Sequence, residues 1–237
     1  MVKHGIKYKE VASLVDRTKA YQPEEAVELA KKSARAGFDE TIELHLRMGL
    51  DPRNANQQVR GVALLPHGLG KKVKVLVFAQ GESEKIAETA GADYVGNDDL
   101  IKKIEEGWLD FDTAIAIPEM MSKVGKLGKI LGRRGLMPNP KSGTVVAMDN
   151  LPGVIEDARK GRVEYKLDRT AIIHVTLGKA SFDVGMLMDN LTAVIEAVMK
   201  AKPSGAKGQY VKSAYITTTM GPGIKLDLVP TLALTSS

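Results

Sequence analysis

Two kinds of strand pattern follow one another along this chain, and their order constrains the fold more than any other feature of the sequence. Between residues 41 and 50, apolar residues alternate with polar ones, which predicts a strand with one buried face and one wet face. Residues 73–79 form an almost unbroken apolar run, which is typical of a strand buried on both faces. Alternation returns at residues 163–167 and 173–177. A section whose strand is apolar on both faces therefore interrupts a section whose strands alternate.

The middle section has the pattern of a small α/β unit. After the apolar run, the sequence predicts a helix capped by Ser83, a strand at 93–95, a helix capped by Asn97 and a strand at 114–117. Strands that alternate with helices favour parallel pairing with right-handed crossovers. We therefore expect residues 67–160 to form an inserted, three-layer, Rossmann-like α/β domain.

The two flanking sections are each too small to build a core of their own. The elements predicted in them are a helix beginning at Pro23, the strand at 41–50, a hairpin of the strands at 163–167 and 173–177, a long helix capped by Ser181, and a last hairpin whose second strand reaches Leu228. Together they predict one discontinuous α+β sandwich, with an antiparallel sheet and helices on one face, built from residues 1–66 and 161–237. Pro66 and Gly161 mark the two connections, where we expect hinge motion.

Composition excludes several classes of protein. The chain has no cysteine, so disulfides, thiolate metal sites and cysteine nucleophiles are excluded, and its scattered histidines lack metal-ligand spacing. We expect no metal and no cofactor. No apolar run approaches the roughly 20 residues of a membrane span, and the start lacks the apolar core of a signal peptide, so we expect a cytoplasmic protein. A net charge of +5 suits a polyanionic partner.

Two segments have the chemistry of nucleic-acid contact. The tip of the last hairpin combines three hydroxyls, a flexible apolar side chain and a backbone without a side chain, which can approach a sugar-phosphate chain closely. Its residues are Thr217, Thr218, Thr219, Met220 and Gly221. The wet face of the strand at 41–50 could lie beside that tip if the two strands pair. The alternative is an ordinary solvated sheet edge.

The second segment lies between Met120 and Met148, where the sequence has six basic residues, no acidic residue and many glycines. We interpret it as a glycine-studded basic loop suited to phosphates, and the alternative is a charged surface that aids solubility. The basic residues proposed as a secondary RNA or tRNA contact are Lys126, Lys129, Arg133, Arg134 and Lys141.

Several longer motifs occur in the order found in one known family. They are Phe38-Asp39-Glu40-Thr41-Ile42-Glu43, Val59-Arg60-Gly61, Leu65-Pro66-His67-Gly68, the loop 135–144, residues 178–182, and 217–222. Through them the chain resembles the universal large-subunit ribosomal protein L-one family, the ribosomal stalk proteins, of the bacterial type. The resemblance covers nearly the whole chain, and the family's layout of an α+β RNA-binding domain with an inserted α/β domain agrees with the insertion argued above.

The resemblance implies a function and a set of site residues. It implies binding to the stalk of large-subunit rRNA, support for release of deacylated tRNA from the exit site, repression of the protein's own operon mRNA through its leader, and a monomer off the ribosome. Carried over by position, the rRNA and mRNA contacts are Phe38, Thr41, Glu43, Asp168, Thr170, His174, Ser213, Thr219, Met220 and Gly221, to which the hydroxyl tip adds Thr217.

Two rival functions remain open at this point. The motif Gly68-Leu69-Gly70-Lys71 is reminiscent of a nucleotide loop, but it precedes a strand, whereas a phosphate-binding loop follows one, so we expect no enzyme. A nonspecific nucleic-acid-binding protein would bind duplex DNA and stalk RNA with equal affinity, so a competition assay separates it from a stalk-binding protein.

Overall fold

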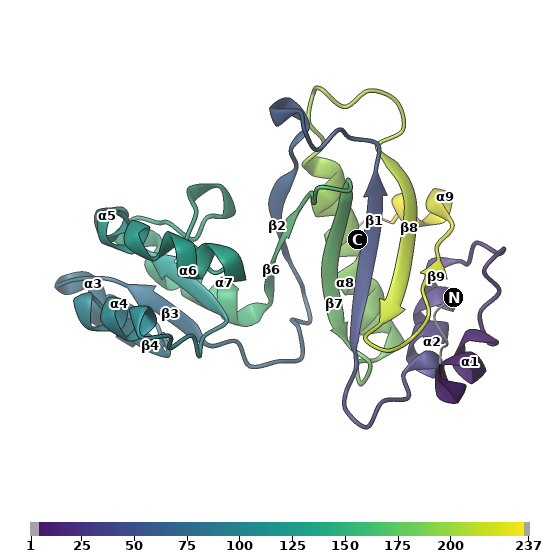
Figure 1. Cartoon of the computed structure of the whole chain (residues 1–237), viewed down its shortest axis with the longest axis horizontal. Coiled ribbons are helices and arrows are strands. Elements are labelled where there is room, and N and C mark those ends of the chain that lie inside the picture. Colours follow the sequence, from purple (N-terminus) through teal and green to yellow (C-terminus); the bar gives the residue numbers. More distant parts are fainter. Residues whose placement is uncertain (1–4, 235–237) are drawn as a thin grey trace. The chain divides into compact units, whose positions relative to one another are not determined.

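The structure, a computed structural model, describes residues 5–234, and it divides into two compact units (Figure 1). The first unit contains the described residues up to Gly70 together with those from Val163 onward, and the second is Lys71–Arg162. These boundaries lie a few residues after Pro66 and Gly161, where the sequence placed the connections. Residues 1–4 and 235–237 of the predicted α+β domain, with His4 among them, lie outside the described residues.

The first unit is built on an antiparallel sheet of four strands in the order β7-β1-β8-β9. Their bounds are Thr41–Met48 for β1, Ile172–Lys179 for β7, Val211–Thr218 for β8 and Ile224–Lys225 for β9. The alternation in β1 is realised, because Ile42, Leu44 and Leu46 are fully buried. They pack under α2 (Pro23–Ser33) and α8 (Val184–Lys200), which contact the sheet on the face behind the strands in Figure 1.

Smaller elements complete this unit. Helix α1 is Ile6–Ala12, a 3-10 turn spans Ala55–Gln57, and helix α9 is Leu228–Leu232. Strands β2 (Arg60–Leu64) and β6 (Arg162–Lys166) form a separate two-stranded sheet.

The second unit has a parallel sheet of three strands in the order β4-β3-β5. The strands are β3 (Val75–Phe78), β4 (Tyr94–Gly96) and β5 (Thr113–Ala116). Leu76 and Phe78 belong to one buried cluster and Val75 and Val77 to another, which explains the unbroken apolar run. The helices are α3 (Glu82–Thr89), α4 (Asp98–Glu105), α5 (Met121–Val124), α6 (Gly128–Arg134) and α7 (Leu151–Lys160). Short 3-10 turns lie at Pro118–Met120, Gly125–Leu127, Pro140–Ser142 and Met148–Asn150.

Two predicted hairpin features are wrong. The strands at 163–167 and 173–177 pair with different partners, because β6 joins β2 while β7 joins β1, and a single bridge between Leu167 and Ile173 connects the two segments. The last strand ends at Lys225, and Leu228 begins α9. The Asp227 carboxylate accepts from the Val229 N–H (3.1 Å), which caps that helix.

Three predicted local features are also wrong. Helix α8 starts after Asp183, because Ser181 is held by Asp39, to whose carboxylate its hydroxyl donates (2.7 Å). Helix α3 starts after Gly81, whose φ of 64° favours glycine, so Ser83 lies inside the helix. The basic glycine-studded segment is partly helical, since α6 runs through Arg134 before the left-handed Gly135 ends it.

Candidate nucleic-acid interface

The face of the four-stranded sheet that α2 and α8 do not cover presents three rows of side chains. Strand register defines the rows because residues opposite one another on antiparallel strands point to the same face. Across β7, β1 and β8 the rows are Thr176, Glu43 and Thr217, then His174, His45 and Tyr215, then Ile172, Arg47 and Ser213. Hydroxyl, carboxylate and aromatic groups therefore outnumber lysine and arginine on this face.

One end of the face combines polar groups with two exposed apolar side chains. Phe38 precedes β1 and Met220 follows β8, and their side chains are 57% and 64% exposed. The two loops meet where β1 begins, because the Thr41 N–H donates to the Thr219 hydroxyl (3.0 Å). Pairing of β1 with β8 therefore places the hydroxyl tip beside Thr41 and Glu43, at the end of the strand that the loop of Phe38 leads into.

A buried carboxylate lies beneath this end. Glu40 is 1% exposed and accepts from the backbone N–H groups of Arg35, Ala36 and Met220. Burial acts to raise the pKa of Glu40, but hydrogen bonds from the N–H groups of Met220 and Ala36, the Thr218 side chain and the Arg35 N–H together outweigh it, so the pKa lies below its ordinary value. Glu40 is absent from the predicted site residues, although it stands in a motif that carries the family resemblance.

The opposite end of the face contains Asp168, Thr170 and Ser213. The Asp168 carboxylate accepts from the Thr170 hydroxyl (2.6 Å) and from the N–H groups of Thr170 (2.8 Å) and Ile172 (2.7 Å). Partial burial acts to raise the pKa of Asp168, but these donors outweigh it and the pKa is lowered. Part of the hydrogen-bonding capacity of Asp168 and Thr170 thus holds their own turn, and Ser213 lies across the sheet, opposite Arg47.

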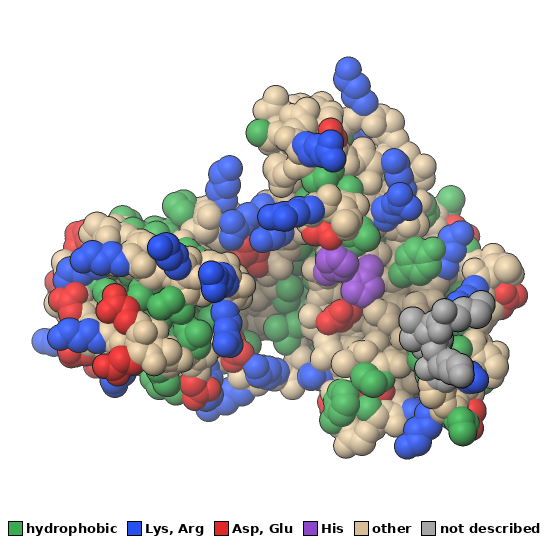
Figure 2. Space-filling view, viewed as in Figure 1, with side chains coloured by type: hydrophobic (Ala, Val, Ile, Leu, Met, Phe, Trp, Pro, Cys, Tyr) green, Lys and Arg blue, Asp and Glu red, His purple; other side chains and the backbone are tan. Residues whose placement is uncertain are grey.

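A pair of histidines occupies the centre of the face. The Nδ1 atoms of His45 and His174 are 2.8 Å apart, and the two adjacent side chains are drawn in purple in Figure 2. Burial and the nearby His174 lower the pKa of His45. Tyr215, opposite His45 on β8, is 37% exposed. His45 and Tyr215 are missing from the predicted site residues. Strand periodicity could have identified them, because His45 lies two residues after Glu43, and Tyr215 two residues after Ser213, on the same face of its strand.

The predicted site residues on the sheet therefore form two groups with this row between them. Glu43 and Arg47 are four residues apart on one strand, a separation of about 13 Å at the usual strand rise. His174 is the one predicted residue that lies within the central row.

The basic cluster of the second unit is highly exposed. The 3-10 turn Gly125–Leu127 carries Lys126, helix α6 carries Lys129, Arg133 and Arg134, and the 3-10 turn Pro140–Ser142 carries Lys141. Within residues 5–234, no carboxylate is within ion-pair distance of these five side chains, whereas Lys123 is bonded to Asp98 (2.9 Å). The five charges are thus available to an anionic partner.

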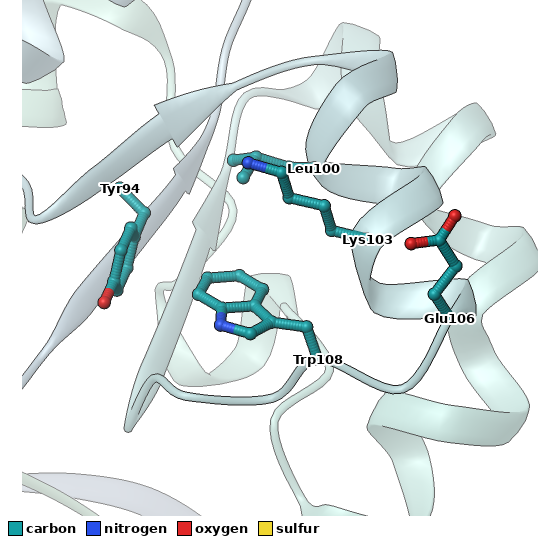
Figure 3. A pocket seen from close by; sticks show the side chains of 5 residues that line it. All are labelled: Tyr94, Leu100, Lys103, Glu106 and Trp108. Atoms are coloured by element: carbon teal, nitrogen blue, oxygen red, sulfur yellow. The ribbon is translucent and has the colours of Figure 1, made fainter.

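One of several pockets in the described residues has a volume of about 440 Å³ and lies in the second unit, lined by Tyr94, Leu100, Lys103, Glu106 and Trp108 (Figure 3). Tyr94 and Trp108 pack edge to face with ring centroids 4.8 Å apart. The pocket's charged groups are the ammonium of Lys103 on α4 and the carboxylate of Glu106 just after it. They do not provide a nucleophile paired with a general base. In the described part of the chain, no group of three metal-ligating side chains converges, and no helix is long and apolar enough to cross a membrane.

The fold and this surface define a mixed α/β protein whose most distinctive feature is an open polar sheet face. The chain belongs to the Ribosomal protein L1p/L10e family, whose sequence model matches residues 29–222. A Large ribosomal subunit protein uL1 of Dehalococcoides mccartyi is 67% identical over 228 residues, 96% of either chain. The protein of the same name from Thermomicrobium roseum is 55% identical over 233 residues, 98% of this chain and 97% of that protein. Membership confirms the resemblance read from the sequence and the expectation that the chain is not an enzyme.

Proposed function

We propose that this protein is a constituent of the large ribosomal subunit in the cytoplasm, and that the open sheet face binds the stalk region of large-subunit rRNA. The observation that carries the proposal is that the loop of Phe38 and the turn of Met220 are joined at one end of a polar sheet, and that each exposes a large apolar side chain. Exposed apolar groups of this kind, rimmed by polar groups, mark a contact surface.

The chemistry of this face suits a folded RNA better than a regular duplex. The major groove of A-form RNA is too deep and narrow for side chains, so loops, splayed bases and 2′-hydroxyls supply specificity. Phe38 offers a ring on which a base can stack, and Met220 adapts to an irregular surface. Glu43 and Asp168 accept hydrogen bonds from 2′-hydroxyls or base amino groups, since carboxylates repel phosphates.

The RNA proposed to contact both groups of site residues must cross the histidine row. We therefore add His45 and Tyr215 to the proposed surface, with Thr41, Thr170, His174, Ser213, Thr217 and Gly221 from the predicted residues. Tyr215 combines an aromatic ring with a hydroxyl, which suits stacking together with a hydrogen bond.

The second unit is proposed to have a different role. We propose that it acts as an inserted Rossmann-like domain joined near Pro66 and Gly161 by connections that permit hinge motion, and that its five exposed cations form a secondary contact to RNA or to exit-site tRNA. Such contacts position a polyanion without reading its sequence. This supports a role in the release of deacylated tRNA.

Regulation of the protein's own synthesis follows if one surface accepts two RNAs. A leader in the operon mRNA that mimics the stalk would occupy the same sheet face, so the free protein, proposed to be a monomer, would repress its own translation. The two RNAs should then compete with each other.

Calorimetry or filter binding with the full chain tests the proposal. We expect the isolated stalk fragment of large-subunit rRNA to bind, a leader-mRNA mimic to compete for the same site, and duplex DNA of equal length to compete poorly at the same salt concentration. Equal competition by duplex DNA would instead identify a nonspecific nucleic-acid-binding protein.

A further inference from the structure

The two exposed apolar side chains of the sheet face sit on loops that are far apart in sequence. Phe38 lies between α2 and β1, and Met220 follows β8. Neither loop is fixed by strand pairing alone, because both lie beyond the ends of their strands. Two further contacts join them: the Thr41 N–H donates to the Thr219 hydroxyl (3.0 Å), and the buried Glu40 is in contact with both loops.

The bonds of Glu40 are divided between its two carboxylate oxygens. Oε1 accepts from the N–H groups of Arg35 and Ala36, both at 2.8 Å, just before Phe38. Oε2 accepts from the N–H group of Met220 at 2.9 Å. One oxygen thus fixes the first loop and the other fixes the second.

The chemistry of these bonds requires a carboxylate. Three backbone donors converge on the side chain, and an ionised carboxylate accepts at both oxygens and donates nothing, whereas an amide would direct N–H bonds at a donor. The bond to the Met220 N–H turns that group inward and leaves its side chain 64% exposed. Gly221 supports the same turn, because a Cβ there would come within 2.4 Å of the Thr218 hydroxyl and 3.0 Å of the Ser33 hydroxyl.

We propose that Glu40 is the positioning residue of the RNA surface, which locks the Phe38 loop and the Met220 turn into one preformed contact before RNA arrives. The inference rests on the proposed RNA-binding function. Preformed loops need not be ordered during binding, so the carboxylate strengthens RNA binding although it is buried away from the RNA. Its negative charge acts in the opposite direction, since a carboxylate repels phosphates that lie within about one Debye length, roughly 10 Å at 0.1 M salt.

The substitution Glu40→Gln tests whether loop positioning or charge repulsion by Glu40 dominates its effect on RNA binding. Glutamine keeps Oε1 for the two N–H groups of the Phe38 loop, which favours that orientation of the amide, and it presents NH₂ to the Met220 N–H. We expect the affinity for the isolated stalk fragment to fall about tenfold. Coulomb repulsion alone predicts the opposite sign, so tighter binding by Glu40→Gln would overturn the proposal.

Asp112→Asn is the matched control. Asp112 also accepts from a backbone N–H group, that of Lys74 (3.1 Å), and its substitution removes the same charge, but it lies in the second unit and is paired with Lys71 (2.6 Å). We expect unchanged affinity for this variant. An equal loss in both variants would overturn the proposal, because it would show a general effect of charge or stability.

A double-mutant cycle separates positioning from general stability. If Glu40 acts through Met220, then Glu40→Gln should weaken binding less than about threefold when Met220→Ala is already present. A full tenfold loss in that background would refute the link. Wild-type protein that fails to bind the stalk fragment refutes the proposed function itself, whereas wild-type binding with an unaffected Glu40→Gln refutes only the role of Glu40.

A measurement on the wild-type chain does not depend on the variant folding. In an NMR acid titration, the amide protons of Arg35, Ala36 and Met220 should shift together with the Glu40 carboxyl. A Met220 amide that does not follow the titration of Glu40 would show that the two loops are not joined through this side chain.

Discussion

Truncating Met220 should weaken RNA binding without affecting the fold. Full burial of a methionine side chain is worth about 1.5–3 kcal/mol. Since 64% of Met220 is exposed in the free protein, burial of that share against RNA contributes about 1–2 kcal/mol, and Met220→Ala should raise the Kd for the stalk fragment about 5- to 30-fold. The free energy of unfolding should change by less than about 0.5 kcal/mol, because an exposed side chain adds little to the core. Thr219→Ala is a less clean test, as it also removes the bond to Thr41.

The assay is calorimetry at several salt concentrations, with Met199→Ala as the matched control. Met199 is a partly exposed methionine on α8, which packs on the other face of the sheet. Its truncation should leave the Kd unchanged. The salt dependence of log K should be the same for Met220→Ala and wild type, because no phosphate contact is lost. Equal losses for the two methionines, or a changed salt slope for Met220→Ala, would refute the reasoning.

Three further predictions concern other parts of the chain. Arg133→Gln combined with Arg134→Gln should barely change the Kd for the stalk fragment, and a loss comparable to that of Met220→Ala in the same calorimetry would contradict the division of roles. Asn190→Ala should lower the free energy of unfolding of the first unit by about 2–4 kcal/mol, since this fully buried amide accepts from the His67 N–H (3.1 Å) and donates to two carbonyls. Urea titration by circular dichroism measures that loss, while fluorescence of the single Trp108 in the second unit should keep its midpoint. The pKa of His45 in the folded protein lies below its ordinary 6.5, so the unfolded chain binds more protons in this pH range. The free energy of unfolding should therefore fall as the pH drops through 6.5 and level off below the folded pKa. Urea titrations of His45→Gln should not show this decline.

The local elements were largely predictable because their signals are local. Alternation in β1 predicted the burial of Ile42 and Leu44, and the unbroken run in β3 predicted burial on both faces of its sheet. The helix from Pro23 follows from fixed backbone geometry at its first position. Each of these signals involves a few neighbouring residues, and the packing agrees with it.

The basic segment shows where a local signal was overruled. Glycines at 128 and 132 predicted a loop, because glycine costs about 1 kcal/mol per position in a helix. Helix α6 forms there because Leu127 and Leu131 are fully buried in the core of the second unit, and their burial outweighs that cost.

What the sequence determined by itself was the kind of strand in each section, the positions of the longer helices, the family, and the alternation that puts polar residues on one face of β1. What only the tertiary structure decided was partnership: β6 pairs with β2, His45 meets His174, and three N–H groups converge on Glu40. The physical reason is that an alternating strand is satisfied by any neighbour of the right register, and a glutamate beside other acids reads as a surface residue. Its burial depends on donors from residues 35 and 220, which are brought together only when the chain folds.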